Sequence, residues 1–160
     1  MFGIPTQRLA KVTVTETTSA VTLSVNPIVI AALSFTPRHL LVRTNVLATT
    51  GTPNFRIRLN GDSGSNYNIQ VLDAAGSSAS TLRETADHFG LPTNVTSDAN
   101  EFCSGSFLFP DALSTRTDKS VLAMSGRVED FLRAGAGRWA NTAAITSVTL
   151  YLDASTFTTG

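Results

Sequence analysis

Residues 54–70, NFRIRLNGDSGSNYNIQ, limit the fold of this chain more than any other stretch. At positions 55–59, phenylalanine, isoleucine and leucine alternate with two arginines. Because successive side chains of a strand point to opposite faces, this pattern predicts a half-buried β-strand that turns its arginines outward. Residues 60–66 are a cluster of turn-forming residues, so the chain is expected to turn there before a second strand over residues 67–72.

We expect this turn to be an ordered loop in which the side chains of Asp62 and Asn66 bond backbone amides. Its segment Gly61-Asp62-Ser63-Gly64 is similar to the nucleophile motif of chymotrypsin-like serine proteases, but no segment around either histidine supplies the base that such enzymes need. Its oxygens could also serve as calcium ligands, although the alternating acids of an EF-hand loop are missing. We therefore predict no catalytic, cofactor-binding or metal-binding residue. The residues of the expected ordered loop are Asn60, Asp62, Ser63 and Asn66.

Short stretches of alternating apolar and polar residues recur along the chain, with turn residues between them. Further strands are expected at residues 9–16, 21–25, 39–47, 101–109, 119–124 and 146–153. We expect residues 39–47 to form a central strand, because apolar side chains fall on both of its faces.

Three segments have less regular patterns. Residues 81–90 combine a capping-box pattern with apolar residues at helical spacing, which predicts one short helix after a flexible connection at 76–80. Residues 28–35 fit a buried turn or a short helix. Residues 128–139 fit a helix in their first half and a strand bent at its glycines in their second half.

Some eight or nine short strands with almost no helix predict an all-β fold, an antiparallel, jelly-roll-like two-sheet sandwich with little helix. The chain has 160 residues, of which 42% are apolar, enough for one core. We expect a single jelly-roll domain over residues 9–160. Residues 1–8 are expected to be an N-terminal arm that docks on the same chain or a neighbour through Phe2, Ile4 and Pro5.

Composition excludes several classes of protein. Twelve basic and twelve acidic side chains give a net charge of zero, so we expect neither nucleic acid nor an anionic membrane as a partner. Only 15% of residues are charged, which suits a surface packed against other chains. The single cysteine, Cys103, excludes an internal disulfide and is expected to be buried. No secretory signal or membrane span is recognisable, so we expect a soluble chain.

A few side chains allow more than one interpretation. Asp87 and His88 could be a pair of metal ligands or an exposed polar turn. Five arginines on or beside expected strands are interpreted as solvated residues or as salt bridges between subunits: Arg56, Arg58, Arg127, Arg133 and Arg138. Four aromatic residues are interpreted as core packing, or in the alternative as an exposed platform for sugars: Trp139, Phe107, Phe109 and Phe131.

Two blocks, residues 54–70 and GRWANTAAITSVTLYL at residues 137–152, resemble a family of jelly-roll structural proteins from tailed-bacteriophage virions. In that family a strand ending in RFNGDSGSNY and a late W-x-NTAAITSITL strand recur. The resemblance follows most of the chain in order but is close only in these two blocks, and neither block is a catalytic signature. It implies a non-enzymatic virion protein. Family members continue past the position of Phe157 into a closing strand, so that strand is expected to be missing, shortened or supplied by another chain.

The resemblance also implies partners and a location. Members of such families are capsid decoration (cement) proteins or parts of tails and tail fibres, usually trimers. We therefore expect a homotrimer that binds the major capsid protein or other virion proteins at the capsid surface, after synthesis in the cytoplasm of the bacterial host. The alternative is a tail or tail-fibre module that recognises the host by binding cell-surface carbohydrate.

Overall fold

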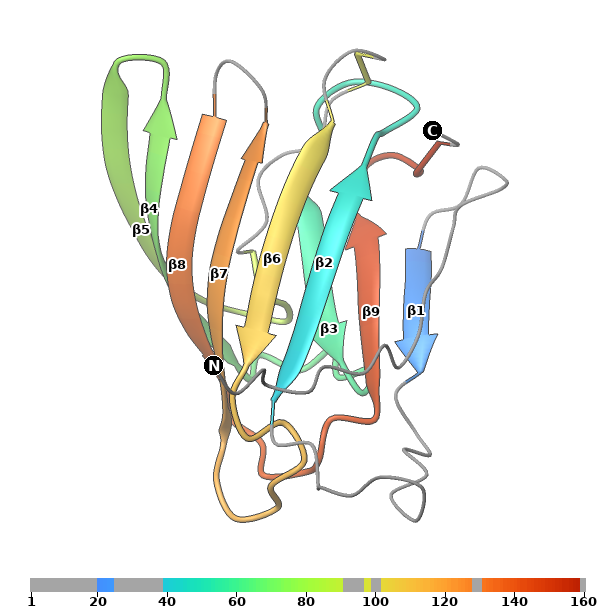
Figure 1. Cartoon of the computed structure of the whole chain (residues 1–160), viewed down its shortest axis with the longest axis vertical. Coiled ribbons are helices and arrows are strands. Elements are labelled where there is room, and N and C mark those ends of the chain that lie inside the picture. Colours follow the sequence, from blue (N-terminus) through green and yellow to red (C-terminus); the bar gives the residue numbers. More distant parts are fainter. Residues whose placement is uncertain (1–19, 25–38, 91–96, 99–101, 128–130, 159–160) are drawn as a thin grey trace, which may run out of the picture.

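The computed structural model describes residues 20–24, 39–90, 97–98, 102–127 and 131–158. These residues form β-strands and no helix (Figure 1). The strands are β1 (Ala20–Ser24), β2 (Leu40–Val46), β3 (Phe55–Leu59), β4 (Tyr67–Ala75), β5 (Ser78–Ala86), β6 (Cys103–Phe109), β7 (Lys119–Arg127), β8 (Phe131–Trp139) and β9 (Ser147–Leu152). The expected arm with Phe2, Ile4 and Pro5, the strand at residues 9–16 and the segment 28–35 lie outside the described residues.

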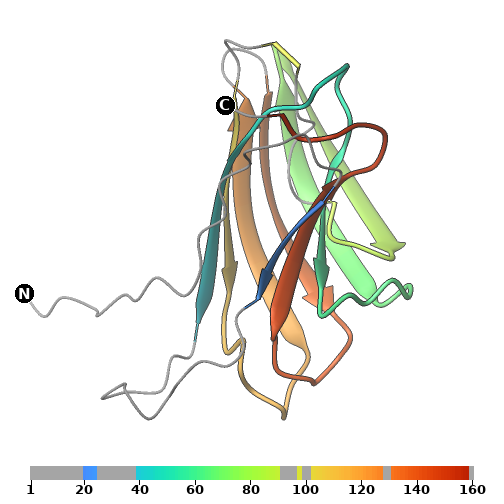
Figure 2. The ribbon, with the colours of Figure 1, turned by 90° about the vertical axis from the view of Figure 1, so that its right-hand side faces the viewer.

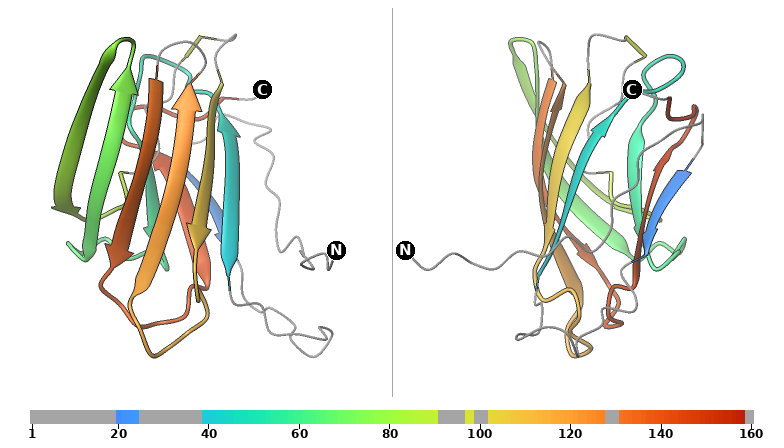
Figure 3. Two further views of the ribbon diagram at one scale, coloured as in Figure 1. Left: turned by 60° about the vertical axis from the view of Figure 1, so that its left-hand side comes forward. Right: turned by 45° about the vertical axis from the view of Figure 1, so that its right-hand side comes forward.

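The strands form two antiparallel sheets that lie face to face (Figures 2 and 3). One sheet has six strands in the order β2-β6-β7-β8-β4-β5, and the other has three in the order β1-β9-β3. The predicted class, an all-β two-sheet sandwich, is confirmed. Within the described part of the chain β2 lies at the edge of its sheet, so the prediction of a central strand there is wrong.

The core lies between the sheets and follows from the alternation of the strands. The apolar residues of β3 are buried, and Arg56 and Arg58 between them face outward, as expected. The ring of Phe55 packs edge-on against Phe107 of the larger sheet, with ring centroids 6.4 Å apart, and Cys103 is also buried. The apolar positions of the last strand, β9, cover the same core: Val148, Leu150 and Leu152.

Residues 81–90 do not form the expected helix. Gly76 has a φ of +55°, and with Ser77 it makes a two-residue turn, so the flexible connection expected at 76–80 shrinks to these two residues. Beyond the turn, β5 pairs with β4 along nine residues in an unbroken antiparallel register. This ladder satisfies the backbone of β5 on one side, and such pairing outweighs a weak local preference for helix.

Residues 131–139 form the strand β8, so the strand interpretation holds for the described part of residues 128–139. Its Gly137 lies beneath Phe89, which bridges to Ile57 of β3 through backbone hydrogen bonds of 2.8 and 3.1 Å. A Cβ at Gly137 would lie 2.8 Å from Cε1 of Phe89, so only glycine allows this approach. The chain thus crosses from the edge of the larger sheet to the edge of the smaller one.

Candidate functional site

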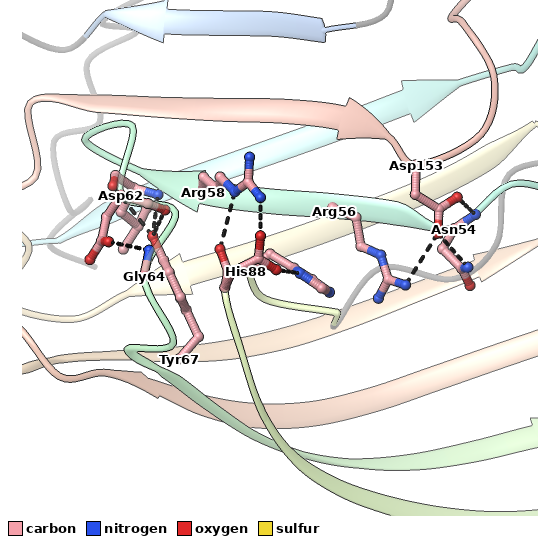
Figure 4. Close-up of polar contacts among 10 residues, drawn as sticks. Asn54, Arg56, Arg58, Asp62, Gly64, Tyr67, His88 and Asp153 are labelled. Atoms are coloured by element: carbon pink, nitrogen blue, oxygen red, sulfur yellow. Dashed lines mark hydrogen bonds and ion pairs between the residues drawn. The ribbon is translucent and has the colours of Figure 1, made fainter.

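The loop between β3 and β4 is ordered by its own side chains. Asn60 and Gly61 have φ values of 53° and 69°, which make the turn. Oδ1 of Asp62 accepts a hydrogen bond from the backbone amide of Gly64 at 2.8 Å (Figure 4). Its Oδ2 accepts from Nδ2 of Asn66 at 3.0 Å and from Nε1 of Trp139 at 2.6 Å. The predicted bond from Asp62 to a backbone amide is confirmed, whereas the Asn66 side chain donates to the Asp62 carboxylate instead of bonding a backbone amide. The long-range partner of Asp62 is Trp139.

Asn60 joins the loop to the chain before β9. Its Nδ2 donates to the carbonyl of Ala144 at 2.8 Å, and its Oδ1 accepts from the amides of Thr146 and Ser147 at 2.8 and 3.1 Å. The two blocks of sequence at residues 54–70 and 137–152 are therefore bonded to each other. The hydrogen bonds of Asn60 and Asp62 connect the two blocks at this end of the sandwich.

The hydroxyl of Tyr67 closes the loop from inside. It accepts from the amide of Leu59 at 3.0 Å and donates to the carbonyl of Asp62 at 3.1 Å, and burial raises its pKa to about 12. Burial also opposes ionisation of Asp62. However, hydrogen bonds from Trp139, Asn66 and Gly64, with the nearby Arg58, outweigh burial and lower the pKa of that carboxyl. An ionised Asp62 is therefore part of the folded loop.

This arrangement makes the loop a structural clamp. Both oxygens of the Asp62 carboxylate accept hydrogen bonds from the protein, and Ser63 is exposed beside it. No group of three or more potential metal ligands among histidine, cysteine and carboxylates occurs in the part of the chain that the structure describes. Of the loop residues expected from the sequence, the structure brings together Asn60, Asp62 and Asn66 around the end of β3.

Along β3 and the end of β9 the outer face of the three-stranded sheet carries polar contacts (Figure 4). Arg56 pairs with Asp153, Nη2 to Oδ2 at 3.2 Å, and the Asn54 side chain donates to the same oxygen at 2.6 Å. Arg58 pairs with Asp87 and lies 4.7 Å from the centre of the Tyr151 ring. Arg56 and Arg58 thus form their salt bridges within one chain and not between subunits.

Asp87 and His88 belong to the same polar face. Nδ1 of His88 lies 2.5 Å from Oδ1 of Asp87. The hydrogen bond to His88 lowers the pKa of Asp87, burial opposes it, and Arg58 adds to the lowering. Because the Asp87 carboxylate already contacts both neighbours, we interpret this pair as part of an ion-pair cluster. Two other expected salt-bridge residues also pair internally, Arg133 with Asp73 and Arg138 with Asp118.

The outer face of the six-stranded sheet is different. Directly opposite residues of an antiparallel pair share a face, and here Leu41 faces Leu108, which faces Leu122, while Met124 and Leu72 lie on either side of Ala134. These side chains are between 36% and 60% exposed. We call this surface the outer apolar face, and its large residues are Leu41, Leu72, Leu108, Leu122, Met124 and Leu132.

The outer apolar face is hollowed near β6 and β7. A shallow depression of about 440 Å³ lies among small residues of these strands, including Ser104, Ser106 and Gly126, with Met124 and Leu132 beside it. The outer apolar face is therefore uneven, with aliphatic side chains that protrude beside a depression lined by small residues. Such a surface can receive the side chains of a partner.

Sequence reasoning missed the outer apolar face. The apolar residues on both faces of residues 39–47 were interpreted as burial on both sides, in a central strand. The signal was present as apolar residues at odd and even positions of several strands. Which of the two faces is covered depends on the second sheet, and that is a property of the tertiary structure.

Three of the four aromatic residues interpreted as core packing do lie in the core. Trp139, Phe107 and Phe109 are buried, and Phe131 is half-buried. Trp139 stacks on Tyr67 with ring centroids 6.3 Å apart. A sugar platform made of these residues would need Trp139, Phe107 and Phe109 on the surface.

Comparison with known proteins gives no family model, no curated protein and no solved structure that matches this chain. In the described ranges there is no helix of the length and hydropathy that a membrane crossing requires.

Proposed function

We propose that this protein is a non-enzymatic structural protein of a phage virion, a capsid decoration protein that attaches to the shell through the outer apolar face. The observation that carries the proposal is that face, because soluble monomers seldom expose a contiguous apolar patch of more than a few hundred Å². The opposite outer surface carries internal ion pairs, whereas on the apolar side the pair of Arg138 and Asp118 lies at the end of β8. A molecule with one apolar and one polar outer surface is suited to lie on a larger assembly.

The size of the outer apolar face fits an interface. Six strands about 4.8 Å apart, each rising about 3.4 Å per residue, give the whole outer side of the sheet roughly 24 by 27 Å, or roughly 650 Å², and the aliphatic residues occupy its central part. A specific interface of standard size buries about 800 Å² on each partner. The face is therefore large enough to support most of a stable contact.

Two exposed arginines at the edges of the outer apolar face indicate the charge that a partner surface should carry. Arg43 and Arg83 are exposed at the two edges of the outer apolar face, and their partner positions on the neighbouring strands are Ser106 and Gln70. A surface with an apolar centre and acidic residues at its rim would complement this pattern. We assign that surface to the major capsid protein of the shell, in keeping with the resemblance of the two sequence blocks. The same resemblance supports a homotrimeric form.

The test adds purified protein to particles that lack it and measures coating of the shell and the temperature at which the packaged genome escapes. Wild type is expected to coat the shell and raise this temperature. The double variant Leu122→Glu/Met124→Glu is expected to bind at least about tenfold more weakly, because it places two charges at the centre of the face. Thr115→Glu/Thr117→Glu adds the same charge to an exposed loop and should bind as wild type does.

Two results would overturn the proposal. If the double variant of the outer apolar face coated particles as well as wild type, this face would not be the attachment surface. If the protein instead localised to the tail or bound host cells, the decoration role would be wrong. The search would then move to a carbohydrate site elsewhere on the chain.

A further inference from the structure

The strand β5 is the outer edge of the six-stranded sheet (Figures 1 and 3). It pairs with β4 on one side, and no strand in the described part of the chain pairs with its other side. Its first six residues are exposed, on both faces of the sheet. The open edge therefore presents unpaired backbone donors and acceptors over the length of a long strand.

This edge lacks the features that usually prevent pairing with another chain. The sequence SASTLRETA contains no proline and no lysine, and its register with β4 has no bulge; its charged residues, Arg83 and Glu84, lie toward the end of the strand and are of opposite sign. Leu82 at its centre is 42% exposed, although its direct neighbour Val71 is only 2% exposed. The apolar inner layer thus ends on an uncovered leucine at the open edge.

We infer that β5 pairs with β5 of a second copy, antiparallel about a two-fold axis that passes through Leu82. In this register Leu82 lies opposite its own copy and Ser78 lies opposite Ala86, so that every residue of the strand is paired. A register centred on Arg83 would place two arginines opposite each other, which is destabilising. One centred on Glu84 would do the same with two acids.

The hydrogen-bond pattern agrees with this register. A two-residue hairpin turn closes on a hydrogen-bonded pair, here Ala75 and Ser78, so the alternation of the ladder directs the even-numbered amides of β5 toward β4. The odd-numbered amides then point to the open edge and can bond the second copy. Leu82 falls at a non-hydrogen-bonded position of the new pair, where opposing side chains approach most closely. The two leucines would bury each other.

This contact concerns the self-association that the proposed function includes, but it does not depend on which particle the protein joins. It relates two chains by a two-fold axis, whereas a trimer relates three chains by a three-fold axis. The β5 contact would therefore link neighbouring trimers, or join two chains where no trimer forms. In either case it extends the outer apolar face across two molecules.

The decisive test is symmetric cross-linking of the full chain under a mild oxidant such as oxidised glutathione. Leu82→Cys places two thiols at one non-hydrogen-bonded pair, within the Cα separation that a disulfide requires. We expect most of this variant to run at twice the chain mass on a non-reducing gel. The matched control Ser80→Cys lies opposite Glu84 of the copy and about 14 Å along the strand from its own equivalent, so it should not cross-link and should run at the mass of one chain on the same gel. The native Cys103 is buried and does not compete.

A second pair of variants measures the affinity by analytical ultracentrifugation. Thr81→Pro removes an outward amide while leaving the bonds to β4, and should weaken the dimer at least about tenfold. Thr81→Ala keeps the amide and should leave dimerisation intact. The inference is wrong if Ser80→Cys cross-links to the same extent as Leu82→Cys. It is also wrong if Thr81→Pro dimerises with the same affinity as wild type. It is also wrong if Leu122→Glu/Met124→Glu, and no β5 variant, abolishes the dimer.

Discussion

Asp62 joins three parts of the structure through its carboxylate. It caps the turn at the amide of Gly64, orients Asn66 and accepts the indole hydrogen of Trp139. Because Trp139 is buried in the core, this bond fixes the loop to the larger sheet. Hydrogen bonds to a charged acceptor are about twice as strong as neutral ones, so the carboxylate is important for stability.

We expect Asp62→Asn to lower the free energy of unfolding by about 1–3 kcal/mol. The amide of asparagine has the size of the carboxylate, but its NH₂ group cannot accept a hydrogen bond. At least one of the three donors to Asp62, from Gly64, Asn66 and Trp139, would therefore lose its acceptor. Urea denaturation followed by tryptophan fluorescence measures the change. Ser63→Asn, an exposed neighbour, should change stability by less than about 0.5 kcal/mol. Equal effects of the two substitutions would contradict a special role for Asp62.

The pH dependence of stability should also depend on Asp62. The pKa values of Asp62, Asp87 and Asp153 lie below the ordinary value of 3.8, and for Asp153 burial opposes hydrogen bonds from Asn54 and the charge of Arg56. A lowered carboxyl pKa stabilises the folded state above the unfolded-state pKa, and this contribution is lost as pH falls through the folded-state pKa.

We therefore expect the free energy of unfolding to lose these contributions as the pH is lowered from 5 toward 2 and to be unaffected by them between pH 5 and 7. Denaturation at a series of pH values checks this expectation. Asp62→Asn should show a smaller loss on acidification than wild type. The same acid slope in both proteins would mean that Asp62 does not contribute to it.

At the level of whole elements, alternation predicted strands well and local motifs predicted helix badly. The patterns at residues 55–59 and 146–153 correspond to β3 and β9, because each has one face in the core. Residues 81–84 match the sequence pattern of a capping box, yet they belong to the strand β5. Hairpin pairing with β4 is a non-local interaction, and no local pattern contains it.

The same reasoning explains what could be foreseen of the candidate sites. The turn at residues 60–66 was predictable from residue types, because Asn and Gly tolerate positive φ and Asp caps a local amide. Its bond to Trp139 joins residues 77 positions apart and was not predictable. The outer apolar face likewise depends on which face the second sheet covers.

The contact between β8 and the chain after β5 gives a prediction at this scale. In Gly137→Ala the new methyl would lie 2.8 Å from Phe89 and 3.1 Å from the carbonyl of Asn68, so we expect a loss of about 1–3 kcal/mol in the free energy of unfolding. Gly126→Ala is the matched control, since its nearest contact is 3.4 Å away, and it should be neutral or slightly stabilising. Thermal denaturation of both variants measures the difference. Equal melting temperatures would contradict the close packing of Phe89 on β8.

For the whole molecule, the two outer surfaces of the sandwich differ in character. The three-stranded sheet turns paired charges outward, whereas the six-stranded sheet exposes aliphatic side chains from β2 across to β4. Folding alone does not require this difference, because an outer face of a two-layer sandwich is ordinarily solvated. We attribute it to assembly.

This difference predicts a separation of stability from solubility. Leu122→Glu/Met124→Glu should unfold at the wild-type denaturant concentration, with a change of less than about 0.5 kcal/mol per site, because both side chains are more than half exposed. Its solubility limit in ammonium sulfate should rise well above that of wild type, since sulfate strengthens apolar association. A large loss of stability would instead mean that these side chains belong to the core.

The outer apolar face also has a thermal consequence. Burial of aliphatic surface near room temperature is driven by the entropy of water, has little enthalpy and weakens on cooling. Attachment through such a face should be accompanied by a negative change in heat capacity in calorimetry. If the proposed attachment is correct, particles should hold the protein more firmly in the warmth of a growing host culture than on ice, and should release it on chilling.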